Sequence, residues 1–418
     1  MVLTNSEIKS RVEAYLKEME SRKSLKKVLL IGPDFTRFFS NAGFICNCIY
    51  HYLAPKGVEV VVLEALGTHV AMTENEIKEM YGDIPLSCFV PHDWRNDVVT
   101  LGQVPGSFIS EITEGLWTDP IECQVNRLVM DKSFDLVISV GQVVPHEVIG
   151  MANHAKNLFV GAGGSDMINK SHMVGAVYGM ERMMGKDFTP VRRIFDYGLE
   201  TFLKDIDIWF ILTVCTAPGG KINTHGIFFG DTRKVLEDAI ALSQKTNIDF
   251  VDTGIKKCVV YLDPKEFKST WLGNKSVYRT RMAIADGGEL LVLAPGVERF
   301  GEDPQIDKLI RKYGYKGRLN TLEQYRKNAD LRENAGCAAH LIHGSSDGRF
   351  KITYAVKNIS QVEIESAGFC SASYEEMVKR YNPEKLRYGY NTLEDGEEIY
   401  YIPNPALGLW INKEKFKD

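Results

Sequence analysis

The feature that most constrains the fold is a series of short, continuously apolar runs that alternate with helical patterns. Strands buried on both faces of a parallel sheet have this composition, because helices cover the two faces. The clearest runs are Lys27–Ile31, Val58–Leu63, Phe134–Val140, Ile206–Cys215 and Lys257–Leu262. Helical patterns occur at Val12–Glu20, Asn75–Tyr81 and Thr232–Thr246. The alternation predicts an open α/β sheet.

The length of 418 residues predicts two or three domains, at roughly 100–200 residues per domain. A polar stretch at 244–254 marks a boundary, and strand patterns resume at Glu289–Leu293 and Lys351–Val356. We expect two α/β domains with mostly parallel sheets and an active site in the cleft between them. The expected parts are an N-terminal domain at 1–247 that carries the site, a linker at 248–274, a C-terminal domain at 275–385, and an irregular tail at 386–418 that packs back on the body.

Composition excludes several classes of function. The formal net charge is −5 and no long Lys/Arg block occurs, so we expect no nucleic-acid partner. No apolar run reaches the roughly 18 residues that a membrane span needs, and residues 1–27 are too charged for a secretory signal. We therefore expect a cytoplasmic protein that does not bind membranes. The eight scattered cysteines form no C-x-x-C pair, which is typical of buried reduced thiols.

Polar segments follow three of the predicted strands. Ligands bind at the carboxyl ends of strands in open α/β sheets, so these segments predict one convergent site. Each residue alone has a structural interpretation, such as a hydrogen-bonded histidine or a surface arginine. The segments are Asp34-Phe35-Thr36-Arg37, Gly67-Thr68-His69 and Gly141 to His146. A capping box at Thr73 and Glu76 predicts a helix start just after His69.

A lysine and further histidines follow the third strand. His146 precedes Lys156 by ten residues, and His172 follows it by sixteen. Five of the nine histidines lie between positions 69 and 172, although spacing alone names no reaction. The glycine run at 161–164 fits a plain turn better than a phosphate cradle. Lys156 by itself would be a solvent-exposed side chain, so it is the occurrence of all these residues together that predicts a site.

This pattern resembles the nickel-dependent lactate racemase family, from about residue 30 to about residue 300. The motifs are D-x-T-R at 34–37, G-T-H at 67–69 with M-T-x-x-E-I at 72–77, and P-H at 145–146. Lys156 and His172 follow at the family's spacing, and Lys275 stands twelve residues before Gly287-Gly288. The resemblance implies an isomerase, a racemase or epimerase that inverts C2 of a 2-hydroxy acid.

The resemblance also implies the cofactor. Lys156 would form the thioamide link to a pyridinium-3,5-bisthiocarboxylic acid mononucleotide, the nickel-pincer nucleotide. Asp34 and Thr36 would contact this cofactor, and His172 would complete the nickel coordination. Nickel suits square-planar coordination and accepts imidazole. Proteins that make the cofactor would be transient partners.

The remaining roles concern the substrate. The resemblance implies that His69 and His146 are paired acid/base residues, that Arg37 and Lys275 bind the carboxylate, and that Trp271 lines the pocket. The C2–H bond is not acidic enough for an ordinary base, so hydride transfer to a pyridinium-like acceptor, with a histidine taking the hydroxyl proton, offers another route. The keto acid then accepts hydride on its other face.

Four departures concern the substrate. Val70 stands where lactate-specific members have arginine, Trp271 and Leu272 replace tyrosine and glutamine, and Asn153-His154 replaces a Gly-Gly pair. Lactate, a larger apolar acid and a sugar acid all remain open as substrates. We expect His154 on a helix surface rather than in a pocket.

Two alternatives remain open. In the first, the chain is a hydrolase or lyase in which His69, His146 and His172 bind zinc or iron. In the second, the chain is a relative that has lost catalysis and binds a carboxylate or a nucleotide. The sequence leaves the oligomeric state, including a homo-oligomer, undecided.

Overall fold

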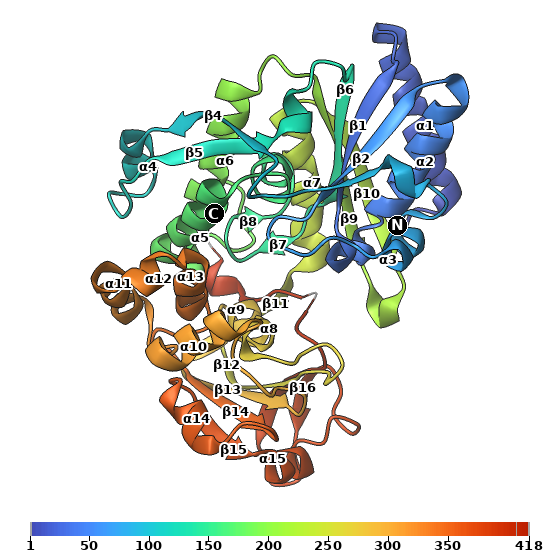
Figure 1. Cartoon of the computed structure of the whole chain (residues 1–418). Helices are drawn as coiled ribbons and strands as arrows, with labels where there is room; N and C mark the ends of the chain where they lie inside the picture. The colour runs from blue at the N-terminus through green and yellow to red at the C-terminus, as the bar shows by residue number, and fades with distance from the viewer. Residues whose placement is uncertain (1, 407, 417–418) are drawn as a thin grey trace. The chain divides into compact units, whose positions relative to one another are not determined.

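The computed structural model describes residues 2–406 and 408–416. The chain forms two compact units, each built on its own six-stranded sheet (Figure 1). Unit 1 consists of Met1–Val174 and Met184–Asn247, and unit 2 consists of Gly175–Met183 and Ile248–Asp418. The expected α/β class with mostly parallel sheets is confirmed.

The sheet of unit 1 has the order β3-β2-β1-β6-β9-β10. Its strands are β1 (Lys27–Pro33), β2 (Glu59–Ala65), β3 (Phe89–Pro91), β6 (Leu136–Gln142), β9 (Ile208–Thr216) and β10 (Asn223–Gly230). All neighbours are parallel except β9 and β10. The strand order reverses at β1, which has β2 on one side and β6 on the other. The topological switch point therefore lies beside β1, where open α/β sheets bind ligands.

Helices cover both faces of this sheet, which explains its continuously apolar strands. Helices α1 (Asn5–Arg22) and α2 (Ala42–Leu53) lie on one side, and α7 (Arg233–Asn247) lies on the other (Figure 1). Val28 and Leu30 belong to the core under α1 and α2. Successive strand side chains point to opposite faces, so the residues between them are buried against the other layer.

The remaining elements of unit 1 surround the switch point. Helix α3 begins with the predicted capping box, in which Thr73 and Glu76 bond each other's backbone. The elements are α3 (Glu74–Tyr81), β4 (Val98–Val104), α4 (Gly106–Ile112), β5 (Ile121–Asn126), β7 (Pro145–His146), β8 (Gly150–Met151), the π-helical turn η5 (Asn157–Gly161), α5 (Ser165–Tyr178) and α6 (Pro190–Phe202). The last residues of α5 belong to unit 2.

The sheet of unit 2 has the order β15-β14-β13-β12-β17-β16, antiparallel only between β16 and β17. Its strands are β12 (Ile255–Tyr261), β13 (Ile284–Ala294), β14 (Lys351–Val356), β15 (Cys370–Ser373), β16 (Gly389–Thr392) and β17 (Glu398–Ile402), beside a separate pair, β11 (Asp249–Val251) and β18 (Trp410–Asn412). Its helices are α8 (Thr270–Gly273), α9 (Lys275–Thr280), α10 (Pro304–Tyr313), α11 (Arg318–Lys327), α12 (Ala329–Arg332), α13 (Ala335–His343), α14 (Gln361–Ser366) and α15 (Tyr374–Arg380).

Two expected segments differ from what the structure contains. Residues 248–274, expected as a linker, supply β11, β12 and α8 to unit 2. Residues 386–418, expected as an irregular tail, supply β16, β17 and β18, and β17 pairs directly with β12. The physical reason is that β12 is buried, so its free edge needs a hydrogen-bonding partner, and the apolar strand β17 provides one.

Two other expectations concern the cysteines and the membrane. All eight cysteines are free thiols, and most of them are buried, as predicted. Of the helices in the described residues, none combines the length and apolar character needed to cross a membrane. The cytoplasmic location stays a prediction.

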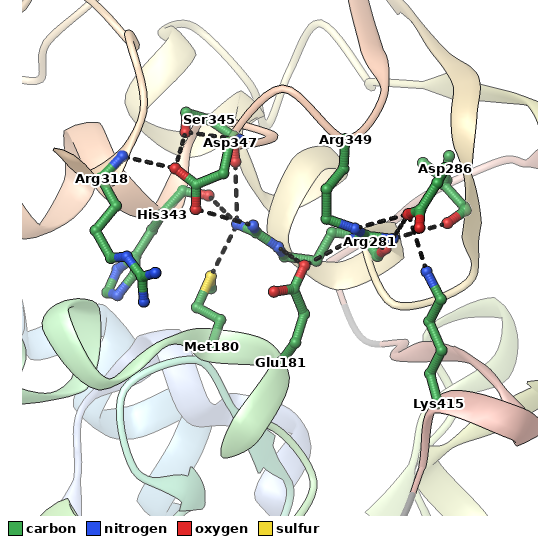
Figure 2. A network of polar contacts seen from close by, with 11 residues as sticks. Met180, Glu181, Arg281, Asp286, Arg318, His343, Ser345, Asp347, Arg349 and Lys415 are labelled. Carbon is green, nitrogen blue, oxygen red and sulfur yellow. Dashed lines mark hydrogen bonds and ion pairs between the residues drawn. The ribbon is translucent and has the colours of Figure 1, made fainter. Parts of the chain in front are cut away.

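An ion cluster around the buried Arg281 side chain connects Gly175–Met183 to the rest of unit 2 (Figure 2). Glu181 Oε1 accepts hydrogen bonds from Arg281 Nε at 2.9 Å and from Arg349 Nη1 at 2.7 Å. The Arg281 side chain is 3% exposed, and its Nη1 donates to the Ser345 carbonyl at 3.0 Å. Burial raises the pKa of Glu181, but the two arginines outweigh burial and lower it. The cluster therefore depends on an ionised Glu181.

We predict that Glu181→Gln lowers the free energy of unfolding by about 2 kcal/mol, because it removes the carboxylate that Arg281 and Arg349 share and leaves the buried Arg281 with the more distant Asp347, at 3.7 Å. Urea titration measures the loss. A carboxyl with a lowered pKa stabilises above its unfolded pKa, near 4.5, and this stabilisation disappears as the pH falls through the folded value. The variant lacks that pH-dependent component.

Glu323→Gln is the matched control, because Glu323 pairs with Lys327 on the surface of the same unit. We expect it to cost less than about 1 kcal/mol. Equal losses in the two variants would contradict the assigned importance of the ion cluster.

Candidate active site at the carboxyl ends of β1, β2 and β6

Asp34 connects the first two strand ends. It caps η1 (Phe35–Ser40), and its Oδ1 accepts hydrogen bonds from the Thr36 amide at 2.9 Å and from the Thr36 hydroxyl. Its Oδ2 lies 2.5 Å from His69 Nδ1, in the loop after β2. The Asp34 side chain is 7% exposed and that of His69 is 52% exposed. A buried carboxylate thus holds an accessible imidazole.

Asp34 selects the tautomer of His69. Burial raises the pKa of Asp34, but the bonds to His69 and Thr36 outweigh burial and lower it. The carboxylate is therefore ionised near neutral pH and accepts a hydrogen bond from Nδ1–H of His69. In the tautomer that this bond selects, Nε2 carries the lone pair that a general base requires.

His146 is held differently. It is buried on β7, and its Nδ1 accepts a hydrogen bond from the Val148 amide at 3.1 Å. A neutral His146 therefore carries its proton on Nε2. Burial lowers its pKa well below the usual value; Glu147 opposes the shift, and Lys156 and Arg37 add to it.

Lys156 stands at the start of η5, the π-helical turn. The side chain of the next residue, Asn157, donates to Ser139 Oγ on β6 at 2.9 Å. At the end of the turn, Gly161 O accepts from the Gly67 amide at 2.8 Å. Single π-helical turns are rare and frequently occur at functional sites. These bonds fix the lysine backbone to both β6 and the loop after β2.

The Lys156 amine is unusually weakly basic. Burial lowers its pKa to about 8, with Arg37 adding to the effect, while Glu147 and Asp34 oppose it. Arg37 is exposed and its charge acts on both Lys156 and His146. A substantial fraction of the amine is therefore neutral and nucleophilic near pH 8.

His172 lies on α5, and one of its ring nitrogens is hydrogen-bonded to the backbone. Its Nδ1 donates to the Ile168 carbonyl at 2.6 Å, so Nε2 of the neutral ring carries a lone pair. Burial lowers its pKa, and the Lys156 charge lowers it further. A metal-binding histidine usually donates its other ring N–H to a carbonyl or carboxylate in this way. The residue therefore fits the expected ligand.

Glu147 is a site residue that the sequence reading did not single out. Its Oε2 lies 3.9 Å from His146 Nδ1. Its charge raises the pKa of His146, Lys156 and His172, the groups that burial lowers. The available signal was its position next to the P-H motif.

The expectation for His154 was wrong. Its side chain is 1% exposed, and its ring stacks on Phe210 with a centroid distance of 3.9 Å. Asn153 and His154 have φ of +71° and +60°. This left-handed backbone suits glycine, which explains why a Gly-Gly pair can occupy these positions. The turn directs the ring inward rather than toward a helix surface.

The structure brings most of the expected residues into unit 1. Hydrogen bonds or electrostatic interactions connect the following residues there: Asp34, Thr36, Arg37, His69, His146, Lys156 and His172. Trp271 and Lys275 belong to unit 2. Trp271 stacks on His340 at 3.9 Å, and Lys275 Nζ lies 5.7 Å from the Phe267 ring centroid. Their substrate contacts stay predictions.

A three-histidine metal site is not formed. Within residues 2–406 and 408–416, no three His, Cys, Asp or Glu side chains are placed together to hold a metal ion. The alternative of a hydrolase or lyase with three histidine ligands therefore has no preformed metal site among the described residues.

Comparison with known proteins agrees with the motifs. Residues 6–184 match the family model described as the lactate racemase N-terminal domain. A crystal structure of a protein from Thermotoga maritima is similar, with a TM-score of 0.81, 23% identity and coverage of 98% of this chain and 99% of that one. The lactate racemase apoprotein from Thermoanaerobacterium thermosaccharolyticum has a TM-score of 0.72, 16% identity and coverage of 96% and 92%. These identities show a shared fold. No curated protein sequence matches the chain.

We predict that Lys156 reacts with limiting acetic anhydride with a midpoint near pH 8, because burial and Arg37 lower its pKa. Competitive labelling read by mass spectrometry measures the midpoint. Free Nα-acetyl-lysine amide, whose side-chain amine has a pKa of about 10.4, serves as the reference. Arg37→Gln should move the midpoint upward. A wild-type midpoint near that of the reference would contradict the assigned environment.

Proposed function

We propose that this chain is an isomerase that inverts C2 of a 2-hydroxy acid, because its residues 6–184 match the family model of the lactate racemase N-terminal domain. We further propose that it uses a nickel-pincer nucleotide attached to Lys156. The observation that carries the proposal is the pairing of an amine whose pKa is lowered to about 8 with neutral His172, whose Nε2 is open. These are the two groups that a tethered nickel cofactor requires from the protein.

The residues fit the absent cofactor on chemical grounds. A lysine must be neutral to attack the carboxyl-derived carbon of the nucleotide, and burial favours this state. Imidazole is a suitable nickel ligand, and the Ile168 carbonyl fixes the tautomer of His172 that can bind it. When bound, the nucleotide would supply a reversible hydride acceptor for the hydrogen on C2.

His69 is the proposed base for one enantiomer. Its Nε2 takes the proton of the substrate hydroxyl as C2 loses its hydrogen. Asp34, bonded to Nδ1, stabilises the imidazolium that forms and keeps the ring oriented. The same nitrogen returns the proton when hydrogen is added back to C2.

His146 is the proposed partner for the opposite face. In its resting tautomer Nε2–H donates a hydrogen bond to the substrate oxygen, and Nδ1 accepts from the Val148 amide. To act as a base the ring must give up the Val148 bond and change tautomer. Glu147 offsets part of the burial that disfavours the imidazolium. The two histidines therefore begin as complementary tautomers.

The substrate carboxylate is assigned to Arg37, whose planar fork can hold a carboxylate by two parallel bonds. A contact from Lys275 stays a prediction. Val70, beside His69, is 88% exposed, and an apolar substrate chain would cover it. This favours a larger apolar 2-hydroxy acid over a sugar acid, and lactate is the smallest member of the series to test.

The central experiment uses protein co-expressed with cofactor-forming enzymes. We expect the wild type to contain nickel and a covalent adduct at Lys156, and to invert at least one member of a panel of 2-hydroxy acids, as measured by chiral chromatography. Lys156→Ala should lose both the adduct and turnover. His172→Ala should keep the adduct and lose nickel. Turnover by Lys156→Ala would refute the attachment of the cofactor to Lys156. A wild-type protein that contains zinc and an unmodified Lys156 would favour a hydrolase.

We predict that His69→Ala and His146→Ala each slow inversion by about 10²–10⁴-fold, the usual contribution of a general acid or base. Intact mass should show the adduct retained in both. The ratio of kcat/KM for the two enantiomers must remain unity, because the equilibrium is unchanged. Normal rates in both variants would overturn the acid/base assignment. Tight binding of hydroxy acids by wild type without inversion would instead favour a non-catalytic relative.

A further inference from the structure

Unit 1 contains a cavity of about 570 Å³ where β9 begins. The end of α6 and the residues just before α7 form its walls. Leu203, Ile208 and Phe210 give it an apolar floor, and His154 and Asp196 are polar groups along the wall. None of the residues assigned to the proposed reaction lines it. The cavity therefore requires a separate explanation.

His154 is the most informative residue of this cavity. Its side chain is 1% exposed and stacked on Phe210, yet neither ring nitrogen has a hydrogen-bond partner. Asp196 Oδ1 also lacks one. Burial and the nearby Arg192 and Arg233 lower the pKa of His154 well below its usual value, so its ring offers one donor and one acceptor. A buried polar group without a partner costs about 1–3 kcal/mol, and a ligand with a hydroxyl group would satisfy it.

The backbone at His154 is also strained. A non-glycine residue with positive φ costs of the order of 1–3 kcal/mol, and two occur in succession at Asn153 and His154. The neighbouring contacts hold this conformation: Arg192 Nη2 donates to the Asn153 carbonyl at 3.1 Å, and the His154 amide donates to Asn153 Oδ1 at 2.7 Å. The strain places the His154 ring over Phe210, which indicates a use for the ring there.

The charge at the rim indicates the sign of the ligand. Glu200, Asp205 and Asp231 line the cavity, are exposed and form no ion pair with a described residue, against a single unpaired cation, Lys204. The deeper Arg233 does not change this balance, because Asp187 and Asp196 accept its hydrogen bonds at 2.6 to 3.1 Å. The unpaired rim groups thus carry a net charge of −2, from three carboxylates and one lysine, and attract a cation.

We propose that this cavity binds a small organic amine whose ammonium group lies at the acidic rim and whose apolar body lies on Leu203 and Phe210. A hydroxyl group at the far end of the ligand bonds His154, and Asp196 Oδ1 accepts a second bond. The site needs neither nickel nor the nucleotide, so the proposal is independent of the isomerase assignment.

Calorimetric titration of the full chain with tyramine tests the proposal, because tyramine carries an ammonium group, an aromatic body and a distal hydroxyl. We expect saturable binding at one site. Phenethylamine, which lacks the hydroxyl, should bind about 3- to 10-fold more weakly, the value of one neutral hydrogen bond. The anion 3-(4-hydroxyphenyl)propionate should bind more weakly still. An anion that binds more tightly than the amine would overturn the proposal.

Three variants locate the binding site. His154→Gly suits the positive φ and should weaken tyramine about 3- to 10-fold while abolishing the preference over phenethylamine. Asp205→Asn with Asp231→Asn should weaken both amines and reduce the salt dependence of binding. Glu79→Gln, which removes an exposed carboxylate on α3, is the matched control and should change nothing. Unchanged binding in His154→Gly would mean that the amine does not bind at His154, which overturns the proposal. No binding of any amine at millimolar concentration would mean that the cavity holds water only.

Discussion

The pairing of β1 with β2 on one side and β6 on the other is the constraint on which the rest of unit 1 depends. Parallel neighbours place their carboxyl ends at one edge, so Asp34, His69 and the segment ending at His146 meet although about a hundred residues separate the first from the last. The π-helical turn after Lys156 is bonded to β6 and to the loop after β2. The amine therefore occupies the same edge because of strand order, and not because of any local sequence preference.

Burial then gives these groups their chemistry. In a site of low effective dielectric constant a charge interacts strongly with its neighbours, and the charged form of an amine or imidazole is disfavoured. Lys156, His146 and His172 all respond in this direction, and Glu147 opposes the shift in all three. A single carboxylate thus limits how far burial can neutralise a cluster of nitrogen bases. The balance leaves an amine that is neutral enough to react and imidazoles that are neutral enough to accept a proton or bind nickel.

The three site histidines have different proposed roles because a different group bonds Nδ1 of each ring: a carboxylate, a backbone amide or a backbone carbonyl. His69 bonds an ionised carboxylate and keeps a basic Nε2. His146 accepts an amide proton and so carries Nε2–H. His172 donates to a carbonyl and keeps a lone pair on Nε2 in a half-buried position. His154, which belongs to the separate cavity, has no such partner. The identity of the group on the other nitrogen, rather than the residue type, sets the function proposed for each ring.

The sequence by itself determined the local elements. Apolar runs predicted β1, β2, β6, β9 and β12, and a Thr-x-x-Glu pattern predicted the start of α3, since burial and capping depend on near neighbours. Motif spacing also named the residues that meet at the switch point. Only the tertiary structure decided the tautomers, the lowered pKa of Lys156, the role of Glu147, the inward position of His154 and the place of β17 beside β12. Each of these properties depends on groups that are distant in sequence and that folding brings within a few ångströms of one another. A local sequence pattern cannot predict such contacts.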